Sequence, residues 1–322
     1  MTTYAGSAPA ASSHGGKTVG KGFGLLDVTG LLLLIPPPLF WAGNFIVGRA
    51  LRHDIPPMTL SFWRWVIALL VLLPFAWRPM RRDLHKYWRY RWRVLSLSLA
   101  GVVGFTSLVY LGLRSTTAAN GLLLNSFIPI LIVLFGALFY RQRLRAGQLL
   151  GLTLSFAGVL TIVMHGEWSR LASLSFSPGD LTVFCAMVSW AFYTLWLRGI
   201  PAEIDRVGLL GMQIMVALAV LGPLSLLEGA SGQVATWSAE SLGALAYLGL
   251  FPSVIAYLLY NLGVARVGAA RAGLSIHLIP LFGVVLAVLF LGETVHGYQL
   301  LGMATILAGV TCAARFQAPA AR

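Results

Sequence analysis

The sequence is poor in charge. Only 10% of its 322 residues are Asp, Glu, Lys or Arg, whereas a soluble domain carries about 25%. Hydrophobic residues make up 58% of the chain, and the mean hydropathy is +0.81. This composition excludes an ordinary water-soluble domain and indicates a polytopic membrane protein.

Cysteine is also scarce. Cys185 and Cys312 each lie inside an apolar run, and the chain has neither a Cys-x-x-Cys pair nor a Cys/His cluster. Disulfide and metal sites are therefore excluded, and we expect two buried, unreactive thiols.

Enzyme signatures are missing as well. An integral-membrane enzyme needs clustered His, Asp or Glu near one interface, but the six histidines are scattered. No glycine-rich phosphate loop ends in Lys-Ser or Lys-Thr, which argues against ATP-driven transport. We expect neither catalysis nor a bound cofactor.

Long uncharged runs are plentiful. GLLLNSFIPILIVLFGALFY and LGALAYLGLFPSVIAYLLYNLG each have the length of roughly 20 residues that a helix needs to cross a bilayer. The breaks between such runs predict ten transmembrane helices at 30–49, 58–77, 94–113, 118–140, 147–164, 180–198, 207–228, 242–263, 269–291 and 296–314. The start of the chain is rich in Gly, Ala and Ser and has no cleavable signal pattern, so we expect a disordered tail.

The net charge of +13 is concentrated in a few loops, above all in RPMRRDLHKYWRYRWR at 78–93. Basic loops beside membrane spans set topology, and Trp and Tyr anchor such loops at lipid headgroups. With the N-terminus in the cytoplasm, 18 basic residues fall in cytoplasmic segments and four in outer ones. We therefore predict a bacterial inner-membrane protein with both termini in the cytoplasm. We expect lipid contacts, no nucleic-acid partner, and a monomer or weak homodimer.

The chain contains an internal repeat. QLLGLTLSFAGV, which begins at Gln148, and QLLGMATILAGV, which begins at Gln299, are identical at seven of twelve positions. The same 151-residue shift aligns two Ile-Pro pairs, and FWAGNFIVGRAL at 40–51 resembles SWAFYTLWLRGI at 189–200. Each half holds five helices. Because five is odd, the second half crosses the membrane upside down, as in many secondary transporters.

The repeated segments carry glycines seven residues apart, namely Gly151, Gly158, Gly302 and Gly309. Such glycines share one helix face and allow close helix packing, so we expect the last helix of each half to be scaffold. The expected organisation is a cytoplasmic tail at 1–29, a first repeat at 30–165, a second, inverted repeat at 179–315 and a tail at 316–322.

Several motifs carry a family resemblance. FWAGNF opens the first helix and FWRWVIALLVLLPFA the second, and Ile-Pro is followed by Gly-Glu-Thr, Gln-Leu-Leu-Gly and Ala-Gly-Val. From residue 30 to 315 the chain resembles the EamA-type branch of the drug/metabolite transporter superfamily, and is most similar to YddG-type exporters of aromatic amino acids. The resemblance implies a secondary transporter that exports aromatic and other apolar amino acids by alternating access. Gln142 departs from it, since the family usually has an acidic residue there, as at Glu293.

Arg64 is the most informative single residue. It lies about 9 Å along the second predicted helix, where ionisable side chains usually face a water-filled cavity or a partner. One hypothesis is that its guanidinium binds a substrate carboxylate. The alternative is an arginine that reaches outward or pairs with loop carbonyls.

Polar and aromatic residues recur along single faces of other predicted helices and should point inward, because lipid does not satisfy polar groups. The candidate cavity residues are Trp41, Asn44, Arg64, Trp65, Asn125, Ser189, Tyr193, Tyr257, Tyr260 and His277. His277 is a candidate proton or ligand contact, with a satisfied interior histidine as the alternative. Candidate hinges, or static kinks, are Pro36, Pro37, Pro38, Pro129 and Pro280.

Acidic residues are missing from the middle of every predicted helix. A proton-driven exporter of cationic drugs is therefore disfavoured, and an arginine in an aromatic cavity favours a carboxylate-bearing or zwitterionic apolar substrate. An exporter or passive facilitator of another metabolite, such as a vitamin, nucleoside or drug-like compound, remains open. So do the direction of transport and the coupling ion.

Overall fold

The structure is a computed structural model that describes residues 25–141, 145–164, 166–167, 177–291 and 296–316. Every regular element in these residues is a helix. Eight helices are long and apolar enough to cross a membrane, and two shorter apolar helices, Ala146–Ile162 and Gly297–Ala313, accompany them. These ten segments fall where the sequence predicts ten transmembrane helices, which confirms the all-α membrane fold.

The first half begins five residues earlier than expected, at Leu25. Its elements are α1 (Leu25–Leu32), α2 (Pro36–Ala50), α3 (Pro57–Arg82), α4 (Leu84–Arg89), α5 (Arg91–Leu97), η1 (Ser98–Gly104), α6 (Phe105–Leu113), α7 (Ala118–Asn125), α8 (Ile128–Tyr140) and α9 (Ala146–Val163). The proline run explains the gap between α1 and α2, because proline fits the first turn of a helix but breaks its interior.

The second half repeats this order. Its elements are α10 (Pro178–Leu197), α11 (Arg206–Ala230), α12 (Ala239–Leu250), η3 (Phe251–Ile255), α13 (Ala256–Val267), α14 (Ala269–Leu274), η4 (Ser275–His277), α15 (Leu278–Leu291) and α16 (Gly297–Phe316). Gln142 and Glu293 lie outside the described residues. Cys185 is exposed on α10 and Cys312 is partly buried, so the expectation of two buried thiols is wrong: Cys185 faces outward from the helix bundle.

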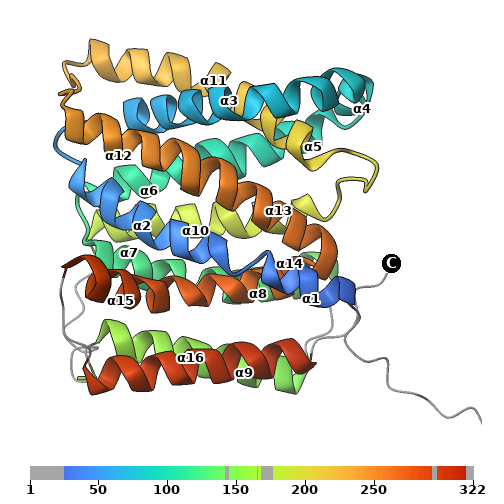
Figure 1. Cartoon of the computed structure of the whole chain (residues 1–322), viewed down its shortest axis with the longest axis vertical. Helices are drawn as coiled ribbons and strands as arrows, with labels where there is room; N and C mark the ends of the chain where they lie inside the picture. Colours follow the sequence, from blue (N-terminus) through green and yellow to red (C-terminus); the bar gives the residue numbers. More distant parts are fainter. Residues whose placement is uncertain (1–24, 142–144, 165, 168–176, 292–295, 317–322) are drawn as a thin grey trace, which may run out of the picture.

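The two halves run in opposite directions. In Figure 1 the chain follows α2 from right to left but its counterpart α10 from left to right. We call the end where α1 begins and α16 ends the termini end, and the opposite end the far end. Both helices that follow these two, α3 and α11, lie side by side at one edge of the molecule.

The other edge is formed by α9 and α16, which pack closely against each other. A Cβ added to Gly158 would lie 2.7 Å from the carbonyl oxygen of Gly302, and one added to Gly151 would lie 2.6 Å from that of Gly309. These distances are shorter than side chains tolerate. The backbones therefore meet directly at the four glycines.

Helix irregularities also repeat. The third helix of each half contains a π-helical turn, η1 in the first and η3 in the second. The fourth helix of each half is broken, between α7 and α8 and, through η4, between α14 and α15. The prolines expected to be hinges, Pro129 and Pro280, stand directly after these breaks. Discontinuous helices at matching positions of inverted repeats are typical of the region around a transport site.

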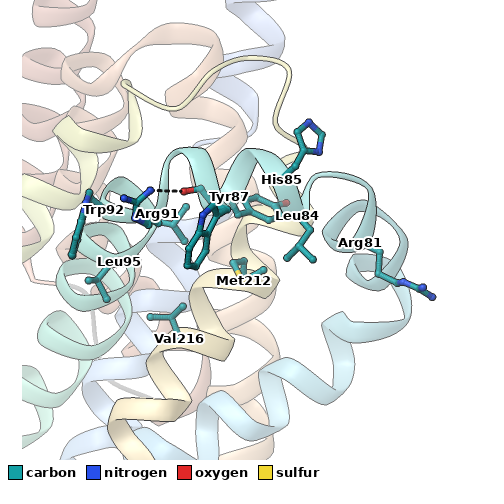
Figure 2. Close-up of a pocket in the computed structure, with 11 residues that line it drawn as sticks. Arg81, Leu84, His85, Tyr87, Arg91, Trp92, Leu95, Met212 and Val216 are labelled. Carbon is teal, nitrogen blue, oxygen red and sulfur yellow. Dashed lines mark hydrogen bonds between the residues drawn. The ribbon is translucent and has the colours of Figure 1, made fainter.

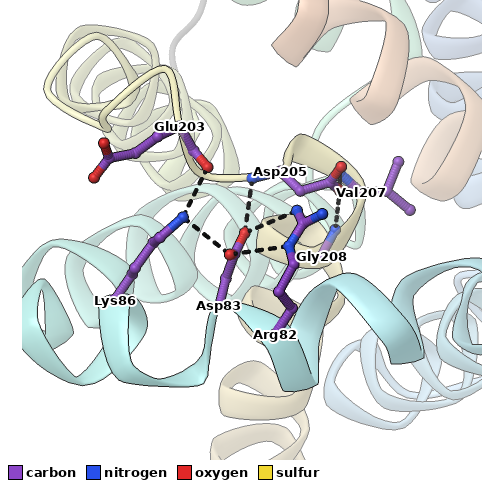
Figure 3. A network of polar contacts seen from close by, with 7 residues as sticks. All are labelled: Arg82, Asp83, Lys86, Glu203, Asp205, Val207 and Gly208. Carbon is purple, nitrogen blue, oxygen red and sulfur yellow. Dashed lines mark hydrogen bonds and ion pairs between the residues drawn. The ribbon is translucent and has the colours of Figure 1, made fainter.

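At the termini end, Asp83 joins the two repeats, as Figure 3 shows. Its carboxylate accepts from the backbone N–H of Asp205 at 3.2 Å, from the Nε of Arg82 at 3.3 Å and from the Nζ of Lys86 at 3.0 Å. Burial alone would raise the pKa of this carboxyl, but the three donors outweigh burial and lower it to about 2. The side chain of Asp205 in turn caps α11.

A matching contact lies at the far end. The carboxylate of Glu228, near the end of α11, accepts from the backbone N–H of Met58 at 3.1 Å and of Thr59 at 2.8 Å, at the start of α3. The carboxylate of Asp83, just after α3, thus binds the residue before α11. The carboxylate of Glu228, near the end of α11, binds the first residues of α3. We call these contacts the Asp83 tie and the Glu228 tie.

Candidate functional site

Arg64 lies on α3 with only 2% of its surface exposed. Its Nε donates to the hydroxyl oxygen of Ser253 at 2.8 Å, and its Nη1 donates to Asn44 Oδ1 at 2.9 Å and to the hydroxyl oxygen of Tyr110. All three partners are uncharged. Among the described residues, no carboxylate lies within ion-pair distance of this guanidinium. The site therefore holds a buried positive charge without a counterion, which is costly unless an anion joins it.

The π-helical turn η3 orients the Ser253 hydroxyl so that its oxygen accepts from Arg64. The Ser253 hydroxyl donates to the carbonyl oxygen of Leu248, five residues earlier, at 2.6 Å. Its oxygen is then free to accept from the guanidinium, which also donates through Nη2 at 2.6 Å. Because η3 belongs to the second repeat and α3 to the first, Arg64 connects the two halves at the centre of the molecule.

The second repeat has a glutamine where the first has this arginine. A shift of 149 residues aligns ALLVLLP at 68–74 with ALAVLGP at 217–223. Gln213 therefore occupies the position of the second repeat that is equivalent to Arg64 in the first. Gln213 is fully buried, and neither of its side-chain amide atoms has a hydrogen-bond partner among the described residues. The charge at the site is thus present in one repeat alone.

Beside Arg64 lies a cluster of buried aromatic rings centred on Trp190. Its members are Trp41, Trp65, Phe105, Trp190, Tyr193, Tyr257 and Tyr260. The Trp190 ring lies 5.1 Å from Trp41, 5.2 Å from Tyr257 and 5.4 Å from Tyr260, measured between centroids. Trp65 joins the cluster to the guanidinium, whose Cζ is 5.2 Å from its ring. We call this group the aromatic cluster.

Most polar atoms of these rings have hydrogen-bond partners. Tyr257 donates to the carbonyl oxygen of Gly101 in η1 at 2.5 Å, and Tyr193 donates to Asn261 Oδ1 at 2.8 Å. The indole N–H of Trp41 donates to the carbonyl oxygen of Pro252 at 3.1 Å. The π-helical turns and the residues beside them therefore hold the cluster in place from both repeats.

The centre is closed. The space between Trp41, Asn44 and Asn125 has a volume of about 10 Å³, enough for one water molecule. The Nδ2 atom of Asn125 has no hydrogen-bond partner among the described residues. In this structure a substrate does not fit beside the cluster without movement of the helices.

A larger cavity of about 870 Å³ lies at the termini end. Four arginines line it, namely Arg93, Arg198, Arg206 and Arg266, and its described lining contains no carboxylate. We call it the arginine vestibule. Its lining includes Val264, one helical turn beyond Asn261, which accepts a hydrogen bond from Tyr193 of the aromatic cluster. The Nη1 atom of Arg206 has no partner among the described residues.

Two predicted cavity residues lie elsewhere. Ser189 donates to the carbonyl oxygen of Ala100 at 2.9 Å, at the contact of α10 with η1. His277 does not line the central space; its Nδ1 lies 2.5 Å from Ser155 Oγ and its Nε2 lies 3.0 Å from the carbonyl oxygen of Ser126. Both ring nitrogens have partners, which is the geometry of a satisfied interior histidine.

The structure also adds residues that the sequence reasoning missed. Trp190 is the centre of the cluster, and Tyr110 binds Arg64. The signal for Trp190 was present, because the alignment of 40–51 with 189–200 places it opposite Trp41. Tyr110 carries no such signal.

The sequence of this chain matches a known protein family. The model of the EamA-like transporter family matches residues 28–164 and 177–315. The uncharacterized transporter YyaM of Bacillus subtilis is 26% identical over 294 residues, covering 88% of this chain and 92% of that protein. An uncharacterized transporter of Archaeoglobus fulgidus is 29% identical over 280 residues, covering 87% and 95%.

A probable amino-acid metabolite efflux pump of Escherichia coli is 25% identical over 280 residues, covering 84% of this chain and 89% of that protein. One crystal structure of a similar chain has a TM-score of 0.68 at 21% identity, covering 90% and 95%. At that identity the likeness concerns the fold alone.

Proposed function

The chain belongs to the EamA-like transporter family, and from that premise we propose that it exports amino acids, aromatic and other apolar ones first, by alternating access. That it is a multi-pass membrane transporter follows from the family match and the ten apolar helices. The substrate and the mechanism are our proposal. Both follow from the residues around Arg64.

The observation that carries the proposal is the buried guanidinium with only neutral partners. A carboxylate has the geometry to accept two parallel hydrogen bonds from an arginine. It would also neutralise a charge that is otherwise isolated from water. The adjoining aromatic cluster offers an apolar surface for a side chain of the same molecule. An amino acid with an apolar or aromatic side chain combines these two features.

The arginine vestibule supports the same substrate class. Its four arginines and the lack of carboxylates in its described lining attract anions and repel cations. It lies at the termini end, which we propose faces the cytoplasm because of the excess of basic residues there. A carboxylate-bearing molecule would thus enter from inside the cell and move toward Tyr193 and Arg64. That direction is export.

Closure at both ends supports alternating access. The Asp83 tie holds α3 to α11 at the termini end, and the Glu228 tie holds them at the far end. With both ties formed, the space beside Asn125 admits about one water molecule. We propose that the two ties open in turn as the repeats rock, so that the site never faces both sides at once. The broken fourth helices, with Pro129 and Pro280, are the proposed hinges.

Counterflow into proteoliposomes tests the proposal. Vesicles preloaded with unlabelled phenylalanine should accumulate labelled phenylalanine faster than labelled lysine. Arg64→Gln should lower the rate at least tenfold, whereas Arg52→Gln, at a half-buried arginine in the turn after α2 at the far end, should leave it unchanged. Equal counterflow of the wild type and the Arg64→Gln variant would overturn the assigned role of Arg64.

A proton gradient distinguishes coupled from passive transport. The cluster around Arg64 contains no carboxylate among the described residues, so it offers no acidic proton carrier. Uphill accumulation that depends on the gradient would point to coupling elsewhere in the chain. Equilibration alone, with or without the gradient, would make the protein a facilitator.

A further inference from the structure

A second large cavity lies outside the transport path, between α4, α5 and α11 (Figure 2). Its volume is about 920 Å³. Leu95, Met212 and Val216 form an apolar floor, and Arg81, His85 and Arg91 stand along its rim. We call it the α4–α11 groove. It is open to the outer surface of the helix bundle.

The rim carries positive charge that is not neutralised. Arg91 lies between two indole rings, with its Cζ 5.4 Å from Trp88 and 5.7 Å from Trp92. Its one hydrogen bond within the described part of the chain is from Nη1 to the carbonyl oxygen of Trp88 at 3.3 Å. The other guanidinium donors remain available. Figure 2 shows Arg81 toward the opposite end of the groove.

The acidic residue of this segment does not form an ion pair with Arg81 or Arg91. Asp83 is the single acidic residue of the segment 78–93. It is fully buried and binds Arg82, Lys86 and Asp205 in the Asp83 tie. In the part of the chain that the structure describes, no carboxylate pairs with Arg81 or Arg91 at the mouth of the groove.

The aromatic residues place this groove at the membrane surface. Trp88 is 73% exposed and Trp92 is 69% exposed, although both are large and apolar. Tryptophan with such exposure is typical of the headgroup layer. Tyr87 closes the inner side; it is buried beside Gly208, and burial raises the pKa of its hydroxyl above the ordinary value.

We propose that the α4–α11 groove binds an anionic phospholipid. Its phosphate accepts hydrogen bonds from Arg91, an acyl chain lies along Leu95, Met212 and Val216, and Arg81 at the other end of the groove adds to the attraction for negative charge. Charge favours an anionic headgroup over a zwitterionic one, since each arginine near the surface contributes about fivefold in binding to anionic lipid. The apolar floor favours a lipid over a soluble anion. This inference does not depend on the proposed substrate.

Native mass spectrometry of the full chain in detergent tests the site. The protein is titrated with dioleoyl-phosphatidylglycerol or dioleoyl-phosphatidylcholine, and bound lipids are counted. We expect tighter binding of the first lipid. The double variant Arg81→Gln, Arg91→Gln should lose roughly 25-fold of that binding, because two arginines are removed.

The matched control is Arg78→Gln, Arg89→Gln. It removes the same charge from the same segment, with Arg78 on α3 and Arg89 at the end of α4, but neither residue lines the groove. An equal loss in this control would show a general charge effect and overturn the site. Met212→Trp, which fills the floor and keeps every charge, should also lower lipid binding; unchanged binding in this folded variant would contradict the groove.

Competition separates a lipid from a free anion. Inorganic phosphate in large excess over the lipid should leave the bound phosphatidylglycerol in place, because it lacks the apolar contact. Full displacement by phosphate would show that the groove holds a soluble anion and would overturn the proposed lipid. Preference for phosphatidylcholine over phosphatidylglycerol would overturn it as well.

Discussion

Trp41 and Trp190 hold the same position in the two repeats, and their rings meet edge to face with centroids 5.1 Å apart and planes at 79°. The central contact of the molecule is thus made by one residue and its own duplicate. Arg64 and Gln213 share another such position but differ in charge. The duplicated frame is symmetric at its aromatic centre and asymmetric at its polar site.

The first prediction concerns Trp190. Truncation to alanine removes the ring that contacts Trp41, Tyr257 and Tyr260, and should destabilise the protein by about 3–5 kcal/mol. Thermal unfolding of the purified protein in detergent measures the loss. Trp77→Ala, at a half-exposed indole, should shift the melting temperature much less. Similar shifts for the two variants would contradict a central packing role for Trp190.

The second prediction separates stability from transport at Arg64. Taking a charge out of water costs several kcal/mol, and Arg64→Gln removes that cost at the expense of the hydrogen bonds to Ser253, Asn44 and Tyr110. Arg64→Gln should therefore keep or raise the melting temperature while transport falls. Phenylalanine should raise the melting temperature of the wild type but not of the variant, because ligands stabilise the state they bind. A variant that melts far below the wild type would show that Arg64 is mainly structural.

The third prediction is a pH dependence from the Asp83 tie. The folded pKa of Asp83 is about 2, below its ordinary value of 3.8. A carboxyl with a lowered folded pKa stabilises the fold above its unfolded pKa and loses that contribution as the pH falls toward the folded one. Stability from this tie should therefore be complete above pH 4 and decline between pH 4 and 2.

Asp83→Asn tests that dependence directly. The variant should lose about 2 kcal/mol at neutral pH, since hydrogen bonds to a charged group are stronger than neutral ones, and the difference from wild type should shrink as the pH drops to 2. Glu203→Gln is the matched control, because Glu203 joins the network only through its backbone carbonyl (Figure 3). A constant difference between Asp83→Asn and wild type across this range would contradict the assignment.

The fourth prediction concerns the α9–α16 contact. Gly158→Ala places a methyl group 2.7 Å from the carbonyl oxygen of Gly302, so the two helices must separate. The melting temperature should fall by several degrees. Gly243→Ala on α12 has no atom within 4 Å of the added Cβ, and should be neutral or stabilising because alanine favours helix by up to about 1 kcal/mol. An unchanged melting temperature for Gly158→Ala would argue against direct backbone packing.

Local patterns predicted the helices well because hydrophobic length and charge are local properties. The ten segments and the opposite orientation of the halves follow from residue order and composition. The same holds for the breaks beside Pro36, Pro129 and Pro280, where missing backbone donors leave a visible signature. The burial of Arg64 does not follow in this way, because the sequence left open an arginine that reaches outward.

Long-range pairing was not predictable in this way. No residue near His277 in the sequence indicates that its ring contacts Ser155 and Ser126. These contacts decide between a proton or ligand contact and a satisfied interior histidine. Asp83 and Glu228 lie in polar segments that local patterns treat as ordinary loops or helix ends. The π-helical turns are also invisible, because they depend on how η1 and η3 pack rather than on which residues they contain.

Arg64 and Gln213 occupy equivalent positions in the two repeats, but only Arg64 is charged, and this difference affects how the protein responds to a membrane voltage. If the repeats rock about the site, a single elementary charge moves within the bilayer, and no charge moves the opposite way at the equivalent position of the other repeat. A membrane potential acts on a charge with about 2.3 kcal/mol per 100 mV for a full crossing. A tenth of that path is worth about 0.2 kcal/mol at the same voltage. Under the proposed rocking, 100 mV over that path would therefore shift the balance between the two orientations by only about 1.4-fold.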